Sequence, residues 1–223
     1  MNLRLADYII VQPGEDLQSA TRLSDSWEDT PRCNLMYDYV FGASGVFVRA
    51  SRMFLTACVP VGACDIRGLA RVAPSVRFEA QKVPREIVAR ILSRARSACV
   101  ERGQPREILF YLIYEDTSEE SGAWRLVEPE QIATGGSVHP TDDASDDYRR
   151  AIIELHSHHQ MDAFFSSQDD ADEQGFRLYA VIGNIFTNPA LRVRVGVYGY
   201  FYDITASDIF ELPEGVFGGT GDE

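Results

Sequence analysis

A predicted helix followed at once by a fully apolar strand is the feature that most limits the fold of this chain. Residues 84–102 place Pro84 in a first helical turn, repeat apolar side chains at helical spacing and end before Gly103. The segment EILFYLIYED at 107–116 then carries apolar and aromatic side chains at successive positions, which is typical of a central strand covered on both faces. We therefore predict an α/β fold in which a sheet begins against this helix.

The region that follows alternates further strands with a second helix. WRLVEP is expected to pair with the apolar strand as a hairpin. AIIELHSHH predicts a strand, SSQDDADEQGF a helix with a Ser cap and an acidic first turn, and RLYAVIGNI and LRVRVGVYGYFYDI two further strands. Residues 137–147 are acidic and rich in turn formers, so we expect an exposed connection there, with a recognition insert that orders on binding as the alternative.

Short apolar segments separated by turn residues occupy the first third of the chain. DYIIVQ, YDYVFGASGVFVRA, MFLTACVPV and IRGLARV each predict β structure. We therefore divide the chain into a β-rich region at 1–80, a mixed α/β domain at 81–210 and a flexible, acidic, Gly-rich tail at 211–223.

Charge and hydropathy narrow the class of protein. The net charge of −13 opposes phosphate attraction, and no Lys/Arg-rich block offsets it, so nucleic acid is an unexpected partner. No apolar run approaches about 18 residues, and the apolar stretch at the N-terminus is too short for the core of a signal peptide. We therefore predict no membrane partner and a cytoplasmic location. There the four cysteines are expected to remain thiols.

Three of the four histidines fall within residues 156–159, directly after the apolar strand AIIEL. On a strand, side chains at i and i+2 point to the same face, so His156 and His158 can present two imidazole nitrogens to one point, as tetrahedral zinc requires. The carboxylates that follow are Asp162, Asp169, Asp170, Asp172 and Glu173. The S-x-x-D pattern that begins at Ser166, at the start of a predicted helix, favours Asp169 as the third ligand.

A fourth zinc position left to water would make this site catalytic, since zinc lowers the pKa of its water toward about 7 and a nearby carboxylate can take the proton. Glu107 is the predicted general base because it stands at the mouth of the apolar strand, next to which the strand with His156 and His158 can pair. Glu115, at the far end of the same strand, is the runner-up, and Glu154 is a weaker candidate.

The complete pattern is a Glu at the start of a strand that follows a helix, then H-x-H, seven residues and S-x-x-D. This pattern resembles that of the JAMM/MPN metalloproteases, which include the prokaryotic JAB proteins, and the resemblance covers roughly residues 83–205. It implies a curved mixed sheet of the cytidine-deaminase-like kind, flanked by helices. The roles it implies are zinc ligation by His156, His158 and Asp169, catalytic proton transfer by Glu107, and a hydrogen bond to the oxyanion from Ser166.

Within the bacterial branch, the Gly-Val-Tyr-Gly run at 196–199 makes the chain similar to the JAB-domain protein of the ParB-related, ThiF-related cassette (PRTRC). The implied activity is zinc-dependent hydrolysis of a peptide or isopeptide bond at the C-terminus of a ubiquitin-like protein or its conjugate, with a ThiF-like activating enzyme as a further partner. A non-catalytic MPN-like scaffold for protein assembly and a zinc hydrolase acting on a small amide are the alternatives.

Two positions depart from the family pattern. His159 stands where a Pro is usual, and it is either a solvated loop residue or a rival ligand. The strand after Glu107 has bulky side chains where relatives carry glycines, which narrows the room for a peptide and favours the small-amide alternative. Phe164 and Phe165 either line a substrate groove or anchor the loop in the core.

Overall fold

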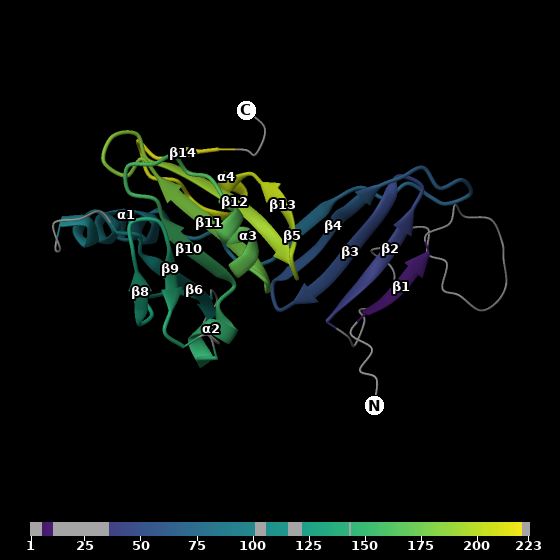
Figure 1. Ribbon diagram of the computed structural model, residues 1–223, viewed down its shortest axis with the longest axis horizontal. Helices are drawn as coiled ribbons and strands as arrows, with labels where there is room; N and C mark the ends of the chain where they lie inside the picture. The colour runs from purple at the N-terminus through teal and green to yellow at the C-terminus, as the bar shows by residue number, and fades with distance from the viewer. Residues whose placement is uncertain (1–5, 11–35, 101–105, 116–121, 143, 220–223) are drawn as a thin grey trace. The chain divides into compact units, whose positions relative to one another are not determined.

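A computed structural model describes residues 6–10, 36–100, 106–115, 122–142 and 144–219. The chain forms two compact units, Met1–Glu79 with Val197–Tyr202 and Ala80–Gly196 with Asp203–Glu223. Each unit is built on a sheet of its own (Figure 1).

The first unit contains a five-stranded sheet in the order β1-β2-β3-β4-β5. β1 runs parallel to β2, and the other neighbours are antiparallel. The strands are β1 (Ala6–Ile10), β2 (Tyr37–Gly42), β3 (Gly45–Arg52), β4 (Leu55–Ala63) and β5 (Ser75–Phe78). Val40, Phe47, Cys58 and Val72 form one buried cluster in this unit. The predicted β-rich N-terminal region is therefore confirmed.

Two of the predicted N-terminal segments differ in detail. YDYVFGASGVFVRA forms two strands, because the chain turns tightly between Gly42 and Gly45, which pair with each other. Gly45 has a φ of +146°, and a Cβ there would collide with the carbonyl oxygen of Gly62. The prediction of β structure for IRGLARV is wrong, since this segment is a connection in which Gly68 has a φ of +83°, and the strand begins later, at β5.

The other sheet has the order β13-β12-β11-β10-β6-β7, with β14 paired to β12. All its strands belong to the second unit apart from the end of β12 at Val197 and the first residues of β13, Tyr200–Tyr202. β10 lies at its centre, parallel to β11 and antiparallel to β6. The strands are β6 (Leu109–Glu115), β7 (Ala123–Val127), β10 (Ile153–Ser157), β11 (Phe176–Gly183), β12 (Ala190–Val197), β13 (Tyr200–Ile204) and β14 (Phe217–Gly218). Because β10 and β11 are parallel, the chain between them must run back along one face of the sheet before β11 begins.

The predicted helix at 84–102 is present as α1 (Arg85–Val100), and residues 101 and 102 lie outside the described ranges. α1 buries its apolar side chains, which are Ile87, Val88, Ile91, Leu92 and Ala95. Burial of each isoleucine, valine and leucine among them contributes about 1.5–3 kcal/mol by transfer from water. Two residues after the end of β11, the Ile185 carbonyl accepts a hydrogen bond of 2.6 Å from Arg96 Nε. β6, which follows α1, is buried from Leu109 to Ile113, as its continuously apolar sequence predicted.

Three segments have more secondary structure than the sequence predicted. Part of the acidic segment 137–147 is ordered, as strand β9 (Val138–Pro140) paired with β8 (Gln131–Ala133), followed by the start of helix α2 (Asp146–Arg150). This helix forms because Ser145 caps it by accepting a hydrogen bond from the Tyr148 backbone N–H. None of the described residues of 137–147 is buried, as the prediction of an exposed connection requires, but the segment has secondary structure that the sequence did not predict.

The segment predicted as one strand, LRVRVGVYGYFYDI, is the β12–β13 hairpin. Tyr198 and Gly199 form its turn, both with positive φ, at 50° and 90°, the backbone that two-residue hairpin turns require. The segment predicted as a flexible tail at 211–223 contains β14, which pairs with Ala190 and Leu191 of β12. Helix α4 (Ala206–Ile209) precedes it, and residues 220–223 lie outside the described ranges.

These elements confirm the predicted fold class, a mixed α/β architecture with a curled mixed sheet and few helices. Among the described residues, no helix is both long and apolar enough to cross a membrane. The cytoplasmic location stays a prediction.

Candidate metal centre

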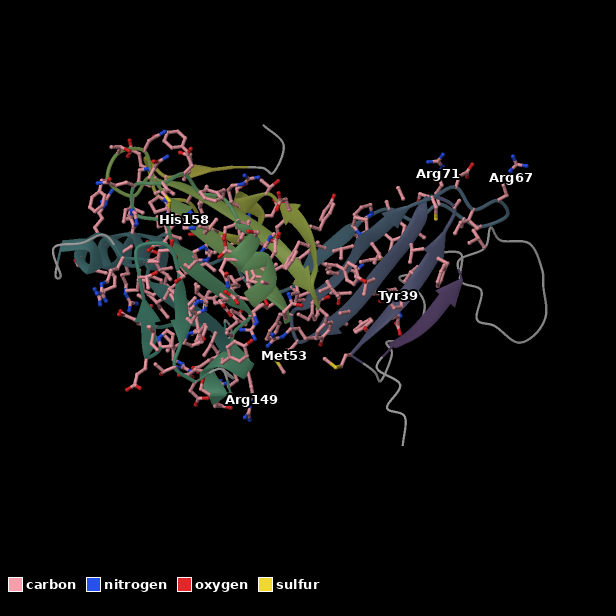
Figure 2. All side chains as sticks on the ribbon, in the orientation of Figure 1. Tyr39, Met53, Arg67, Arg71, Arg149 and His158 are labelled. Atoms are coloured by element: carbon pink, nitrogen blue, oxygen red, sulfur yellow. The ribbon has the colours of Figure 1, made fainter. Side chains whose placement is uncertain are left out.

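The two predicted histidine ligands lie at the carboxyl end of the central strand β10. Figure 2 labels His158. His156 pairs with Leu109 of β6 on one side and with Val181 of β11 on the other. His158 follows the last residue of β10, and its backbone N–H donates to the Ile182 carbonyl at 2.8 Å, which extends the strand pairing by one step. Strand alternation therefore brings both rings to one face, and their Nε2 atoms lie 3.2 Å apart.

The surroundings of His158 fix which of its nitrogens can bind a metal. Its Nδ1 lies 3.0 Å from the Asp162 carbonyl oxygen, and because that oxygen can only accept, Nδ1 carries the proton and Nε2 keeps a free lone pair. Burial lowers the pKa of His158, and it lowers the pKa of His156 to about 4. Both rings are therefore neutral at physiological pH, as ligation requires.

Asp169 is brought to these nitrogens by the cap of helix α3 (Ser167–Asp172). Its Oδ2 accepts from the Ser166 backbone N–H at 2.5 Å and from Ser166 Oγ at 2.7 Å, and its own N–H donates to Ser166 Oγ at 3.2 Å. This reciprocal capping box leaves Oδ1 facing the site, 3.5 Å from His156 Nε2. The S-x-x-D pattern thus serves both as a helix start and as a device that orients one carboxylate oxygen.

These distances suit a tetrahedral metal. With metal–nitrogen and metal–oxygen bonds of about 2.0–2.2 Å, neighbouring donors of a tetrahedral zinc lie about 3.3 Å apart. One donor atom from each of His156, His158 and Asp169 lies within 4.8 Å of the others. The three residues therefore form a group that can bind a metal ion.

Glu107 lies beside this group, just before β6. Its backbone N–H donates to the Thr134 carbonyl at 3.1 Å, its side chain is 5% exposed, and its Oε1 is 3.8 Å from His158 Nε2. The adjacent segments are bonded to each other, since Ser157 N–H donates to the Ile108 carbonyl and Ser157 Oγ accepts from Ile108 N–H. Burial, and then the negative charge of Asp169, raise the pKa of Glu107 to about 7.

The other candidate carboxylates have different partners. Glu115 Oε1 accepts from Arg125 and Arg150, and Glu154 Oε2 accepts from Arg177 Nη1 at 3.0 Å. Asp162 Oδ1 accepts from the Asn184 side-chain amide, and Gln168 Nε2 donates to Asp172 at 2.8 Å. Asp170 and Glu173 both accept from Arg194. Of the carboxylates considered from sequence, Asp169 and Glu107 are those that the structure places beside the histidine pair.

His159 is committed to the surrounding loops rather than to the metal group. Its Nδ1 accepts from the Gln160 backbone N–H at 2.8 Å, so the opposite nitrogen carries the proton and donates to the Gly135 carbonyl at 3.0 Å. Phe164 is 40% exposed and its ring centroid lies 4.8 Å from that of His158. Phe165 lies under the Arg194 guanidinium, with 4.0 Å between the guanidinium carbon and the ring centroid.

Sequence reasoning missed three contributors to this site. The hairpin β8–β9 reaches both Glu107 and His159 through Thr134 and Gly135, and its short, turn-rich strands gave no clear signal. The Asp162 carbonyl is a backbone group and has no sequence signal. Arg194 alternates with apolar residues in LRVRVGV, as a solvent-facing side chain would, and its burial is evident only in the structure.

The curled mixed sheet with its His-His-Asp group defines a domain of the JAB/MPN class. A family profile for prokaryotic homologs of the JAB domain matches residues 80–195, slightly more than half of the chain. The chain belongs to this family, as its motif predicted. The match does not support the narrower resemblance to the cassette protein. No curated protein matches the sequence.

Proposed function

We propose that this protein is a zinc-dependent peptidase or isopeptidase. The observation that carries the proposal is the convergence of His156 Nε2, His158 Nε2 and Asp169 Oδ1 beside the buried carboxylate of Glu107. Three protein ligands and an adjacent carboxylate are the parts that a hydrolytic zinc centre needs, and they leave one coordination position for water.

The donor set fits zinc on chemical grounds. Two neutral imidazoles and one carboxylate are ligands that zinc accepts in tetrahedral sites, and the Asp162 carbonyl orients the His158 ring as carbonyl partners of zinc-bound histidines do. When bound, zinc supplies Lewis acidity, which makes water a nucleophile near neutral pH and polarises the scissile carbonyl.

Glu107 supplies the proton transfer. Its pKa of about 7 in the metal-free protein reflects burial and the nearby Asp169, so its carboxylate can accept a proton from the attacking water and return it to the leaving nitrogen. A bound cation would favour the ionised form and lower this pKa. The predicted oxyanion role of Ser166 stays a prediction, and it requires the hydroxyl to turn from Asp169 Oδ2 to the substrate.

The substrate we propose is the C-terminus of a ubiquitin-like protein or its conjugate, and the further partner we propose is a ThiF-like activating enzyme. Family membership supports this choice of substrate class. The bulky side chains of β6, which raised the small-amide alternative, are buried from Leu109 to Ile113 and belong to the core of the sheet. They therefore give that alternative no support.

Two measurements test the proposal. Purified wild-type protein should contain about one zinc per chain by elemental mass spectrometry, and a His156→Ala, His158→Ala double variant that remains folded by circular dichroism should contain none. Wild-type protein should release the C-terminal partner from a ubiquitin-like fusion, whereas Glu107→Gln should keep the zinc and lose at least about 100-fold in rate. Wild-type protein that stays metal-free after zinc is offered would contradict the enzyme and favour the scaffold.

A further inference from the structure

Helix α3 carries the third proposed ligand, yet none of its residues anchors it by burial. It spans six residues, Ser167–Asp172, and none of them is buried. A helix this short is not stable by itself in water, so its position depends on contacts made by its side chains and flanking residues.

One side chain from the sheet makes these contacts on both sides of Asp169. Arg194 lies on β12 and is 5% exposed. Its guanidinium stacks on Phe165, four positions before Asp169. Its Nη1 donates to Asp170 Oδ1 at 2.5 Å, and its Nε and Nη2 both donate to Glu173 Oε2, at 2.9 and 2.6 Å.

The pairing of Arg194 with Glu173 is not explained by a gain in folding stability. Glu173 is also 5% exposed, and burial raises its pKa although the Arg194 guanidinium beside it opposes the rise. Desolvation of a buried arginine and glutamate offsets most of their attraction, so such a pair contributes little net stability compared with apolar side chains of the same size. What the pair does supply is a fixed geometry, because the planar guanidinium has donors in set directions.

We propose that Arg194 is a positioning residue that clamps α3 to the sheet and thereby holds the Asp169 carboxylate at the distance the metal requires. This inference rests on the proposed function, since it concerns the affinity of the same metal group. Arg194 contacts residues before and after Asp169 but is not itself a ligand, so its loss should let α3 shift without removing a donor atom.

A matched pair of double variants separates positioning from stability. Arg194→Met with Glu173→Gln removes the clamp without leaving a buried unpaired charge. The control is Arg177→Met with Glu154→Gln. Arg177 is 4% exposed, bonds Glu154 at 3.0 Å and stacks on Tyr148 at 4.1 Å. It therefore repeats the chemistry of the clamp but, within the described part of the chain, makes no hydrogen bond to α3.

The measurement is zinc affinity, determined by competition with a chromogenic chelator, alongside thermal unfolding and the absorption spectrum of the Co²⁺-substituted protein. We expect the clamp variant to bind zinc about 10–100-fold more weakly than wild type and to show an altered cobalt spectrum, whereas the control keeps both properties. Arg194→Lys keeps a positive charge beside Glu173 but loses the planar guanidinium. Its zinc affinity should lie between those of wild type and the clamp variant.

Equal zinc affinity in wild type and the clamp variant would overturn the inference and leave the proposed function standing. Failure of wild type to bind zinc would overturn both. If the clamp variant does not fold, Arg194→Lys decides, because wild-type affinity and an unchanged cobalt spectrum in that variant would contradict positioning.

Discussion

The two sides of the metal group are held by different means. His156 lies in the central strand of the sheet, paired with neighbours on both sides, and His158 continues that pairing by one backbone hydrogen bond. Asp169 lies on a short exposed helix and is oriented by the Ser166 cap and by Arg194 acting on its neighbours. The comparison indicates that backbone pairing fixes the histidines, whereas side-chain contacts set the carboxylate.

The largest effect should follow from loss of a ligand on the sheet side. His158→Ala removes a buried nitrogen donor, and we expect zinc affinity to fall about 1,000-fold or more, beyond the 10–100-fold typical of losses around a metal site. The sheet should stay intact, since the β10–β11 backbone bonds do not involve this side chain. Competition titration and circular dichroism measure the two properties, and a drop of less than tenfold would mean that His158 is not a ligand.

The pH dependence of stability tests the burial of Glu107. Its pKa is about 7 in the folded, metal-free protein and near 4.5 when unfolded, so the folded protein binds more protons between these values. The resulting stabilisation is fully present below pH 4.5 and is lost as pH rises through 7. Relative to Glu107→Gln, metal-free wild type should lose up to about 3 kcal/mol of unfolding free energy over this range.

Urea unfolding of both chelator-treated proteins at several pH values measures this difference. The histidines titrate in both proteins, so the difference reports Glu107 together with its electrostatic coupling to His158, 3.8 Å away. A difference that does not change with pH would show that the Glu107 carboxyl is not desolvated.

The helix side offers a matched pair of caps. Ser166→Ala should lower stability by about 1 kcal/mol and, because it releases one bond to Asp169 Oδ2, should weaken zinc binding about tenfold. Ser145→Ala removes the equivalent cap of α2, where the hydroxyl accepts from Tyr148 N–H at 3.1 Å. That variant should show the same loss of stability with unchanged zinc affinity. Equal zinc affinities in the two variants would mean that the cap does not orient the ligand.

The smallest effect is expected at His159. His159→Ala removes an exposed hydrogen bond to the Gly135 carbonyl, which contributes about 0.5–1 kcal/mol. Zinc affinity should not change, because both ring nitrogens are used by protein groups. A clear loss of affinity would restore His159 as a rival ligand and weaken the contrast between sheet and helix.

The sequence was most informative where one physical rule acts alone. Helical spacing predicted α1, continuous apolarity predicted β6, and alternation along AIIELHSHH predicted that His156 and His158 share a face. Predictions were poorer where pairing partners lie outside the segment. β8, β9 and β14 have two or three residues each, and they are strands because neighbouring chain segments satisfy their backbone groups.

The candidate site was predicted as a set of donors but not as a structure. The spacing identified Asp169, whereas the bond from Ser166 Oγ to its Oδ2 depends on the cap geometry. The sequence did not identify Arg194 as a residue of the site, because nothing in its own segment shows that its side chain contacts α3 and the residues that flank it. Residue types and spacing thus predict which atoms can bind a metal, and tertiary packing determines how firmly they are held.

The parallel pairing of β10 with β11 has an evolutionary consequence. Two parallel strands need a long connection, and here that connection carries the third ligand at Asp169. Asp169 therefore lies in a connection that the parallel pairing of β10 and β11 requires in any case. Exchange of this one carboxylate would remove one of the three donors and leave every described strand pairing intact, so the fold can persist in a relative that lacks the complete donor set.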